Sequence, residues 1–206
     1  MPSNTYFTIQ DPAQGIYKEK GSKFLAFCYP VTSETDIKEK IATLKSRYFD
    51  ARHHCFAWIL GPEKNHFRAF DDGEPNHSAG DPILGQIRSK GLTNVLVVVV
   101  RYFGGVKLGV GGLIGAYKAA AEYALNNATV VEKDVTQVVE ITFDYFMLSD
   151  VMKLIKEVGV KILVQDFSDI GHLKIEVPIR QMEMLASRLS LMQAMGKNVL
   201  WTVSGG

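Results

Sequence analysis

The sequence predicts an α+β protein with two domains, which we place at residues 1–134 and 135–206. Its 206 residues are enough for one large domain or two small ones, since domains usually run to about 100–200 residues. The first part mixes short aromatic or β-branched runs, typical of strands, with stretches of helical spacing. After Asp134 the pattern restarts, and its order of elements, βαββαβ, is that of ferredoxin-like domains.

Two hairpins with a helix between them open the first domain. A turn containing glycine separates the first two strands, and a Gly-Pro turn separates two aromatic-rich runs. Between the hairpins, apolar residues recur at helical spacing, and Ser33 followed three residues later by Asp36 is typical of a capping box. The expected elements are strands at 15–19 and 23–29, a helix over 35–48, and strands at 54–60 and 66–70.

The rest of the first domain centres on a strand that is buried on both faces. Residues 94–102 are apolar and β-branched without alternation, as in a strand covered on both sides. The Asp-Pro pair at 81–82 suits the start of a helix that ends at Gly91. Directly after the central strand we expect a glycine-rich loop, 103–112, which leads into a helix over 113–127.

The second domain shows clear alternation between strand and helix signals. Its helices carry apolar residues at helical spacing, and its strands are short β-branched runs separated by polar turns. The expected elements are a strand at 136–143, a helix at 147–158, strands at 160–167 and 171–178, a helix at 180–193 and a strand at 198–203. This architecture carries many unrelated functions, so it says little about chemistry.

Composition narrows the class of protein. Hydrophobic residues make up 47% and charged residues 22% of the chain, as in ordinary globular proteins. No apolar stretch approaches the roughly 20 residues of a membrane span, and the N-terminus lacks the basic and apolar regions of a secretion signal. Two cysteines, Cys28 and Cys55, are too few for a disulfide framework and indicate free thiols. We therefore expect a cytoplasmic protein that does not bind membranes.

The glycine-rich loop is the strongest local signal of a binding site. Glycines let a backbone turn at positive φ and approach a ligand, and the N-terminus of the following helix presents N–H groups to an anion. The net charge is only +1, yet the stretch between Asp81 and Glu122 contains no acidic residue. Its basic residues are Arg88, Lys90, Arg101, Lys107 and Lys118, and the loop glycines are Gly104, Gly105, Gly109, Gly111 and Gly112.

Phosphate or a nucleic-acid backbone suits this loop best. Arg101 offers a planar fork, and Lys107 and Lys118 offer point charges. The loop matches neither the P-loop nor the Rossmann spacing, which argues against nucleotide hydrolysis and NAD binding. An alternative interpretation is that the glycines serve only the tight packing of a strand against a helix.

A second group of polar residues comprises Arg52, His53 and His54 on one strand and an acidic cluster after the next strand, Asp71, Asp72 and Glu74. We expect Arg52 and one of the two histidines to lie beside the glycine-rich loop and to join its anion-binding surface. If the two strands pair, both groups meet at one end of the sheet, where imidazole and carboxylate could hold a divalent ion or act as acid and base. Only one of the adjacent histidines can face such a site, because side chains alternate along a strand. The alternative is a solvated acidic turn beside a core histidine. We expect no metal and no cofactor.

Four motifs in this order resemble the YigZ/IMPACT family. They are Ala51 to Trp58, Asp71 to Pro75, Ala79 to Leu84, and Asn94 to Leu113. The resemblance covers residues 15–130 closely and extends to the second domain. It implies a first domain with the fold of the second domain of ribosomal protein S-five, and a ferredoxin-like second domain similar to the last domain of elongation factor G.

The resemblance also implies a connection with translation. Eukaryotic relatives act in translational control by competing for the activator of a stress-responsive initiation-factor kinase. The arrangement here is similar to the bacterial members, for which association with nucleic acid or the ribosome is inferred from the fold. One departure stands in the acidic loop, where the family usually has Ser-Gly-Thr and this chain has Asn76, His77 and Ser78. If the turn needs glycine at position 77, the loop has a different shape here.

These observations favour a protein that binds RNA, the ribosome or translation factors, with a role in regulating translation and without catalysis of its own. Two alternatives stay open. The first is a small enzyme that acts on a phosphorylated metabolite, with the glycine-rich loop holding phosphate and the acidic cluster supplying a base or metal ligands. The second is a protein-interaction module that docks through the ferredoxin-like domain.

Overall fold

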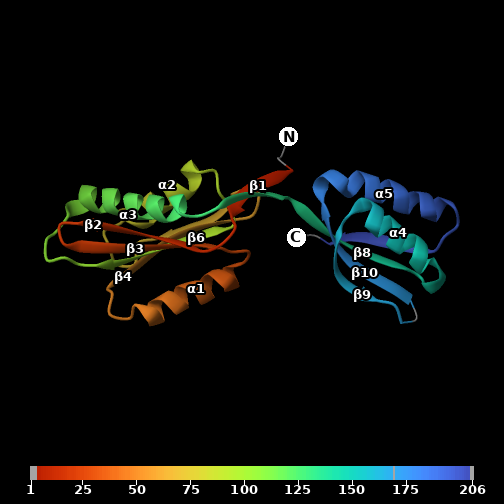
Figure 1. The fold of residues 1–206 in the computed structure, drawn as a ribbon, viewed down its shortest axis with the longest axis horizontal. Coiled ribbons are helices and arrows are strands. Elements are labelled where there is room, and N and C mark those ends of the chain that lie inside the picture. Colours follow the sequence, from red (N-terminus) through yellow and green to blue (C-terminus); the bar gives the residue numbers. More distant parts are fainter. Residues whose placement is uncertain (1–3, 169, 205–206) are drawn as a thin grey trace. The chain divides into compact units, whose positions relative to one another are not determined.

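The computed structural model describes residues 4–168 and 170–204, which form two compact units. The N-terminal unit is Tyr6–Lys133, and the C-terminal unit consists of residues from 134 onward together with Asn4 and Thr5. Residues 1–3, used above to argue against a secretion signal, and Asp169, in the turn before the strand expected at 171–178, lie outside the described residues. Both units are mixed α+β, as predicted (Figure 1).

A five-stranded antiparallel sheet forms the centre of the N-terminal unit, in the order β2-β3-β6-β4-β5. Its elements in chain order are β2 (Ala13–Glu19), β3 (Ser22–Pro30), α1 (Glu34–Arg47), β4 (His53–Leu60), β5 (His66–Phe70), α2 (Gly80–Ser89), β6 (Val95–Tyr102) and α3 (Gly109–Asn126). The predicted central strand is β6, which pairs with β3 on one side and β4 on the other. All the strands expected for the sheet are therefore present.

Helices cover both faces of this sheet (Figure 1). On one face, α2 and α3 bury the odd-numbered valines of β6 and residues such as Phe24 and Cys55. On the other face, α1 packs on the even-numbered residues of β6 and on Trp58. Burial on both faces explains why β6 reads as an unbroken apolar run.

The C-terminal unit has the predicted βαββαβ order. Its elements are β8 (Thr136–Asp144), the 3₁₀ turn η1 (Tyr145–Met147), α4 (Leu148–Val158), β9 (Lys161–Asp166), β10 (Ile170–Pro178), α5 (Ile179–Ala194) and β11 (Val199–Ser204). The antiparallel sheet has the order β11-β8-β10-β9. One face packs on α4 and α5 through residues such as Ile141, Leu173 and Leu185, and the fold prediction for this part is confirmed.

Two strands escaped prediction. β1 (Thr5–Ile9) and β7 (Val130–Asp134) pair as a separate two-stranded sheet. The two strands lie more than 120 residues apart in the chain, and neither alternates clearly between polar and apolar residues. Local periodicity therefore carried no signal for either strand.

The starts of two helices differ from expectation. Helix α1 begins as predicted, with the Ser33 side chain accepting a hydrogen bond from the Asp36 N–H. Helix α2 begins at Gly80, and the carboxylate that caps it belongs to Asp71 rather than Asp81. Helix α3 begins at Gly109, because packing of its Leu113 and Tyr117 onto the sheet outweighs the low helix propensity of glycine.

Candidate anion-binding site

The first carboxylate of the acidic loop holds the loop itself in shape. Asp71 accepts hydrogen bonds from the backbone N–H groups of His77 (2.9 Å), Ala79 (3.0 Å) and Gly80 (2.8 Å). Burial tends to raise the pKa of Asp71, but these N–H donors outweigh it and the pKa is lowered. The carboxylate is thus a structural cap that closes the loop and begins α2.

The loop keeps a left-handed turn at His77 although the residue is not glycine. His77 has a φ of 62°, which lies in the region that glycine favours. Its N–H is held by Asp71, and its Nδ1 lies 2.6 Å from the Asp81 carboxylate. The backbone at His77 therefore adopts a conformation that glycine favours, and contacts with Asp71 and Asp81 hold the residue there.

The next carboxylate joins the acidic loop to the histidine-bearing strand β4. Asp72 accepts a hydrogen bond from the His54 N–H at 2.7 Å, and its carbonyl oxygen lies 2.8 Å from His53 Nδ1. Lys45 from α1 lies 3.7 Å from the same carboxylate. The structure thus brings together the two polar groups that the sequence singled out, while Arg52 remains exposed beside them.

The two histidines diverge, as alternation along a strand requires. His53 pairs across the sheet with Arg101 and shares its face, whereas His54 pairs with Val100 on the face covered by α1. His54 is buried, its Nε2 has no hydrogen-bond partner among the described residues, and burial lowers its pKa. His53 is therefore on the side of the candidate site, and His54 is a core residue.

A buried polar network connects the acidic loop to three further elements. Glu74 Oε1 accepts hydrogen bonds from Arg101 Nη1 of β6 at 2.6 Å and from the Tyr117 hydroxyl of α3 at 2.7 Å. The Cys55 thiol of β4 lies 3.3 Å from that hydroxyl and 2.9 Å from the Asp71 carbonyl oxygen. Only 4% of the Glu74 side chain and 7% of the Arg101 side chain are exposed.

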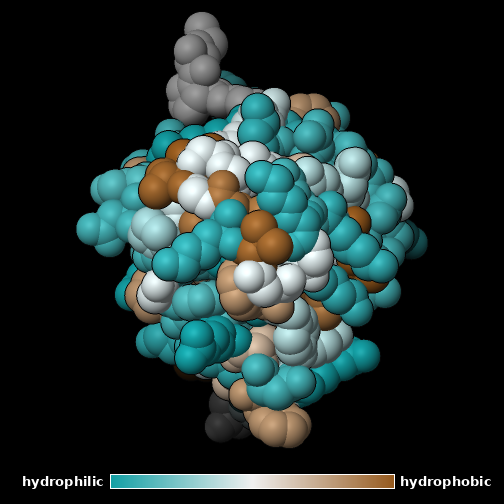
Figure 2. All heavy atoms as spheres, turned by 90° about the vertical axis from the view of Figure 1, so that its left-hand side faces the viewer, coloured by the Kyte–Doolittle hydropathy of each residue, from teal (hydrophilic) through white to brown (hydrophobic). Residues whose placement is uncertain are grey.

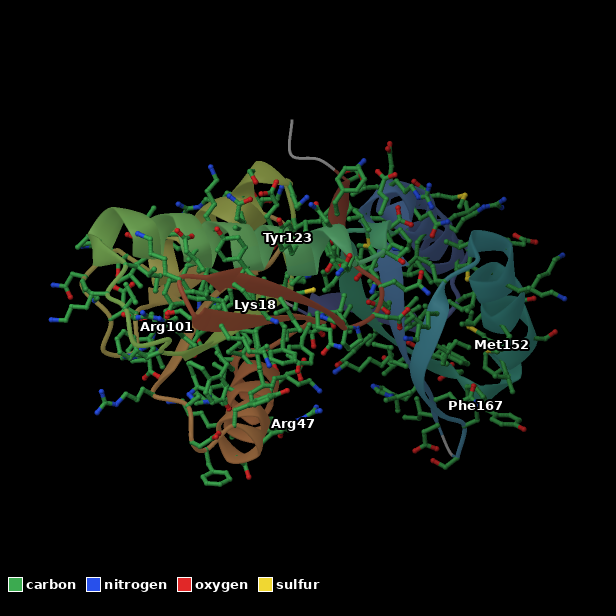
Figure 3. All side chains as sticks on the ribbon, turned by 60° about the vertical axis from the view of Figure 1, so that its left-hand side comes forward. Lys18, Arg47, Arg101, Tyr123, Met152 and Phe167 are labelled. Atoms are coloured by element: carbon green, nitrogen blue, oxygen red, sulfur yellow. The ribbon has the colours of Figure 1, made fainter. Side chains whose placement is uncertain are left out.

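This network changes the role expected for Arg101. The sequence suggested a free fork for an external anion, but Nη1 is occupied by Glu74, and the guanidinium lies over the rings of Phe24 and Phe103. Its Nε is buried and has no hydrogen-bond partner in the described part of the chain. Arg101 is an internal ion-pair partner with one unused donor. Figure 3 labels it toward one end of the unit, away from Tyr123 on α3.

The acidic loop and the glycine-rich segment meet at a pocket of about 360 Å³. Its lining comes from the loop, from the end of β6, and from the first turn of α3: Glu74, Pro75, Arg101, Phe103, Lys107, Leu108, Gly109, Val110 and Leu113. Figure 2 views the N-terminal unit from the end at which β6 leads into α3. Hydrophobic residues are exposed there among hydrophilic ones. Phe103 is 55% exposed there.

The five glycines of the segment serve different purposes. Gly104 packs so closely on the β2–β3 turn that a Cβ would overlap the backbone of Gly21 and Ser22, so its close contact is with a turn between strands and not with a helix. Gly105 and Gly109 have φ values of 86° and 72°, which side chains disfavour. Gly111 and Gly112 lie within the first turn of α3 and not in a loop, and a Cβ at Gly111 would meet no atom within 4 Å.

The remaining basic residues are spread along the helical face. Lys107 and Lys118 are exposed, the first before α3 and the second near its middle. Lys90 donates to the Asn126 side chain at the far end of α3, about 25 Å from Gly109 at 1.5 Å rise per residue. The Arg88 guanidinium stacks over Phe67 at 4.3 Å. Of the five basic residues of the acid-free stretch, Arg101 and Lys107 line the pocket.

The geometry offers little to the metal-site interpretation. Within residues 4–168 and 170–204, no group of three or more His, Cys, Asp or Glu side chains is arranged to hold a metal ion. Each carboxylate of the acidic cluster already has protein partners: backbone N–H groups for Asp71 and Asp72, and Arg101 with Tyr117 for Glu74. No helix in the described chain is long and apolar enough to cross a membrane.

Both thiols are expected to be inert in the folded protein. Burial raises the pKa of Cys28 to about 11 and raises that of Cys55 as well, so neither forms the reactive thiolate near neutral pH. An aromatic disulfide reagent at mildly alkaline pH should label neither residue in native protein and both in concentrated urea, as counted by mass spectrometry. Rapid labelling of Cys55 without denaturant would contradict the buried network.

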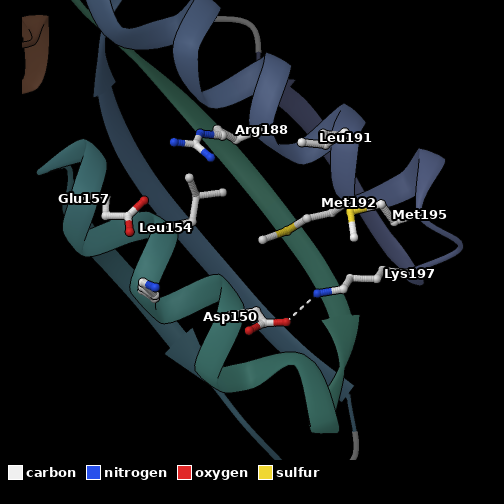
Figure 4. A pocket seen from close by; sticks show the side chains of 9 residues that line it. Asp150, Leu154, Glu157, Arg188, Leu191, Met192, Met195 and Lys197 are labelled. Atoms are coloured by element: carbon white, nitrogen blue, oxygen red, sulfur yellow. Dashed lines mark hydrogen bonds and ion pairs between the residues drawn. The ribbon is translucent and has the colours of Figure 1, made fainter.

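The C-terminal unit has a different character. A cavity of about 230 Å³ between α4 and α5 has an apolar floor that includes Leu154 and Met192, and Asp150 pairs with Lys197 at its rim (Figure 4). The open face of the sheet carries the ion pair between Lys174 and Glu140 at 3.1 Å. Strands β8 and β10 place no phenylalanine, tyrosine or tryptophan on this face, and the ring that they do place there is the imidazole of His172.

Fold and site together define a class of two-domain α+β proteins in which a glycine-rich strand-to-helix segment faces an acidic loop across a pocket. The Impact N-terminal domain family matches residues 20–125. The chain is 33% identical over 154 residues to the IMPACT family member YvyE of Bacillus subtilis, covering 75% of this chain and 71% of the relative. The protein belongs to the IMPACT family.

Further comparisons agree along the whole chain. The IMPACT family member YigZ of Escherichia coli is 30% identical over 181 residues, which cover 87% of this chain and 89% of that protein. A crystal structure described as that of a hypothetical protein superposes with a TM-score of 0.78 at 25% identity and covers 98% of both chains. The family resemblance drawn from the four motifs is confirmed.

Proposed function

We propose that this protein binds RNA through the surface around its glycine-rich segment and acts in the regulation of translation in the cytoplasm. The observation that carries the proposal is a lysine beside a helix N-terminus that no side chain of the described residues caps, both at the pocket. Lys107 is exposed and makes no ion pair within the described chain, and no side chain there caps the N–H groups at the start of α3. A helix N-terminus with a neighbouring lysine attracts phosphate.

Further features support RNA over other anionic partners. Exposed rings and apolar side chains surround the cationic groups, among them Phe103 (55% exposed) and Val106 (52% exposed). Lys118 continues the positive charge along α3. Single-stranded nucleic acid is bound by such combinations of a basic track and stacking platforms. Membership of the IMPACT family adds the expectation of a role in translation, which the sequence resemblance to that family implies.

The proposal contains no catalytic step. The three carboxylates that would have to act as bases or metal ligands hold the acidic loop, the start of α2 and the buried network. Their hydrogen-bond partners leave them poorly suited to accept a proton from a substrate. An enzyme that acts on a phosphorylated metabolite would need other groups.

Lys107→Gln is expected to weaken RNA binding and its dependence on salt. Each phosphate contact that is lost should lower the slope of log affinity against log salt by about 0.7 for single strands and 0.9 for duplexes. Fluorescence anisotropy with labelled single-stranded RNA, duplex RNA and duplex DNA across a salt series measures both quantities.

Lys38→Gln is the matched control, because Lys38 is an exposed lysine on α1, which covers the opposite face of the sheet. It removes the same charge and should leave the slope unchanged. Absence of RNA binding at low salt, or equal effects of the two substitutions, would overturn the proposal.

A further inference from the structure

We propose that the pocket between the acidic loop and α3 binds one nucleotide unit, with its phosphate at the start of α3 and its base against Phe103. The inference deepens the proposed function, since it assigns a ligand to a specific cavity on the RNA-binding surface. The pocket lining combines cationic groups with apolar side chains, and each kind fits a different part of a nucleotide.

The pocket lining offers an anion three kinds of hydrogen-bond donor. Lys107 lines the pocket from the glycine-rich segment, and Gly109 and Val110 line it from the first turn of α3, whose N–H groups have no side-chain cap among the described residues. Arg101 lines it from β6 with a buried Nε that has no acceptor. A buried donor without a partner is costly, and an anion that reached the Nε from the pocket would remove this cost.

The apolar side chains of the lining favour a nucleotide over a sugar phosphate. Phe103, Leu108, Val110, Leu113 and Pro75 supply most of the lining. Sugar hydroxyls placed against these apolar side chains would lack polar partners, and the Glu74 carboxylate already serves Arg101 and Tyr117. A flat aromatic base suits such a wall, and the Phe103 ring, stacked on the Arg101 guanidinium at 5.7 Å, offers a platform.

The volume limits the ligand to one unit. At about 360 Å³, the pocket stands near the lower end of the roughly 300–1,000 Å³ typical of small-molecule sites. That space accommodates a single nucleotide rather than a dinucleotide. The unit has two sources, a free mononucleotide or one unpaired nucleotide of a bound RNA, and both present the same phosphate and base.

The test is calorimetric titration of the full chain with the four 5′-mononucleotides, alongside the four matching nucleosides, ribose 5-phosphate and inorganic phosphate. At least one mononucleotide should bind, and its nucleoside and ribose 5-phosphate should each bind at least about fivefold more weakly, because each lacks one of the two contacts. Equal binding of inorganic phosphate and every mononucleotide would overturn the role of the base. An absence of all mononucleotide binding would overturn the inference.

Val110→Glu is the decisive variant. Val110 is 53% exposed and lines the pocket within the first turn of α3, where an acidic residue stabilises the helix, so the protein should fold. The new charge should lower mononucleotide affinity at least about tenfold. Gly115→Glu adds the same charge to α3 outside the pocket lining, where a Cβ meets no atom within 4 Å, and should change the affinity little. Equal losses in both variants would contradict a pocket-bound ligand.

RNA competition separates this inference from the proposed function. If an unpaired nucleotide of RNA occupies the pocket, the mononucleotide should displace single-stranded RNA, and Val110→Glu should weaken both ligands. Salt-dependent RNA binding without any mononucleotide binding would overturn the pocket assignment and leave the proposed function standing. Mononucleotide binding without RNA binding would uphold the pocket and overturn the proposed function.

Discussion

Glu74→Ala is expected to lower the free energy of unfolding of the N-terminal unit by about 3–5 kcal/mol, the usual cost of removing one partner of a buried ion pair. The substitution removes the carboxylate that pairs with Arg101. Only 7% of the Arg101 side chain is exposed, so water cannot replace the lost partner. The substitution also deprives the Tyr117 hydroxyl of its acceptor. Both groups would then be desolvated without compensation.

Urea unfolding followed by tryptophan fluorescence measures this loss. The chain has two tryptophans, and Trp58 lies in the core of the N-terminal unit, so a Trp201→Phe background makes the signal report that unit alone. A double variant, Glu74→Gln with Arg101→Met, removes both charges and keeps a side-chain oxygen for Tyr117. It should recover much of the loss, because replacing both partners of a buried pair is often nearly neutral.

A loss below about 1 kcal/mol for Glu74→Ala would show that the pair is no stronger than an exposed one. A double variant as unstable as the single one would show that packing of the acidic loop, and not uncompensated charge, dominates. The ion pair is the contact through which the loop reaches β6, so its loss should also disturb the pocket wall formed by Glu74 and Pro75.

Gly104→Ala is expected to destabilise the same unit by about 1–3 kcal/mol, the range of overpacked sites. A Cβ at Gly104 would overlap the backbone of Gly21 and Ser22, and backbone cannot move aside as a flexible side chain can. The Gly104 N–H also donates to the Ser22 hydroxyl at 3.2 Å, and this contact would be lost as the strands separate. The same urea experiment gives the magnitude.

Gly111→Ala is the matched control for the glycine-rich segment. Gly111 lies in the first turn of α3, and a Cβ there meets no atom within 4 Å. This substitution should stabilise the protein by about 0.4–1 kcal/mol, because alanine has less conformational freedom to lose on folding. If Gly104→Ala were as harmless as Gly111→Ala, the close approach of the β2–β3 turn to the end of β6 would not hold in solution.

Local patterns in the sequence determined the architecture and the family. The unbroken apolar run of β6 requires cover on both faces, and the alternation of β8 and β10 requires a sheet with one open face, so these elements could be predicted from periodicity alone. The same holds for the Ser33 cap, because a cap and its partner lie three residues apart. The four motifs indicated the family because their order and spacing can be recognised directly in the sequence, without the fold.

Only the tertiary structure decided the roles of the site residues. Asp71 caps a helix that begins nine residues further on, Arg101 is neutralised by Glu74, and Gly104 touches a turn more than 80 residues earlier in the chain. A charge that looks free in a sequence can be paired in the fold, because pairing depends on distances in space that no local pattern encodes. For the same reason the pairing of β1 with β7 could not be predicted. The pocket could not be predicted either, because it exists only where the fold brings the acidic loop next to the start of α3.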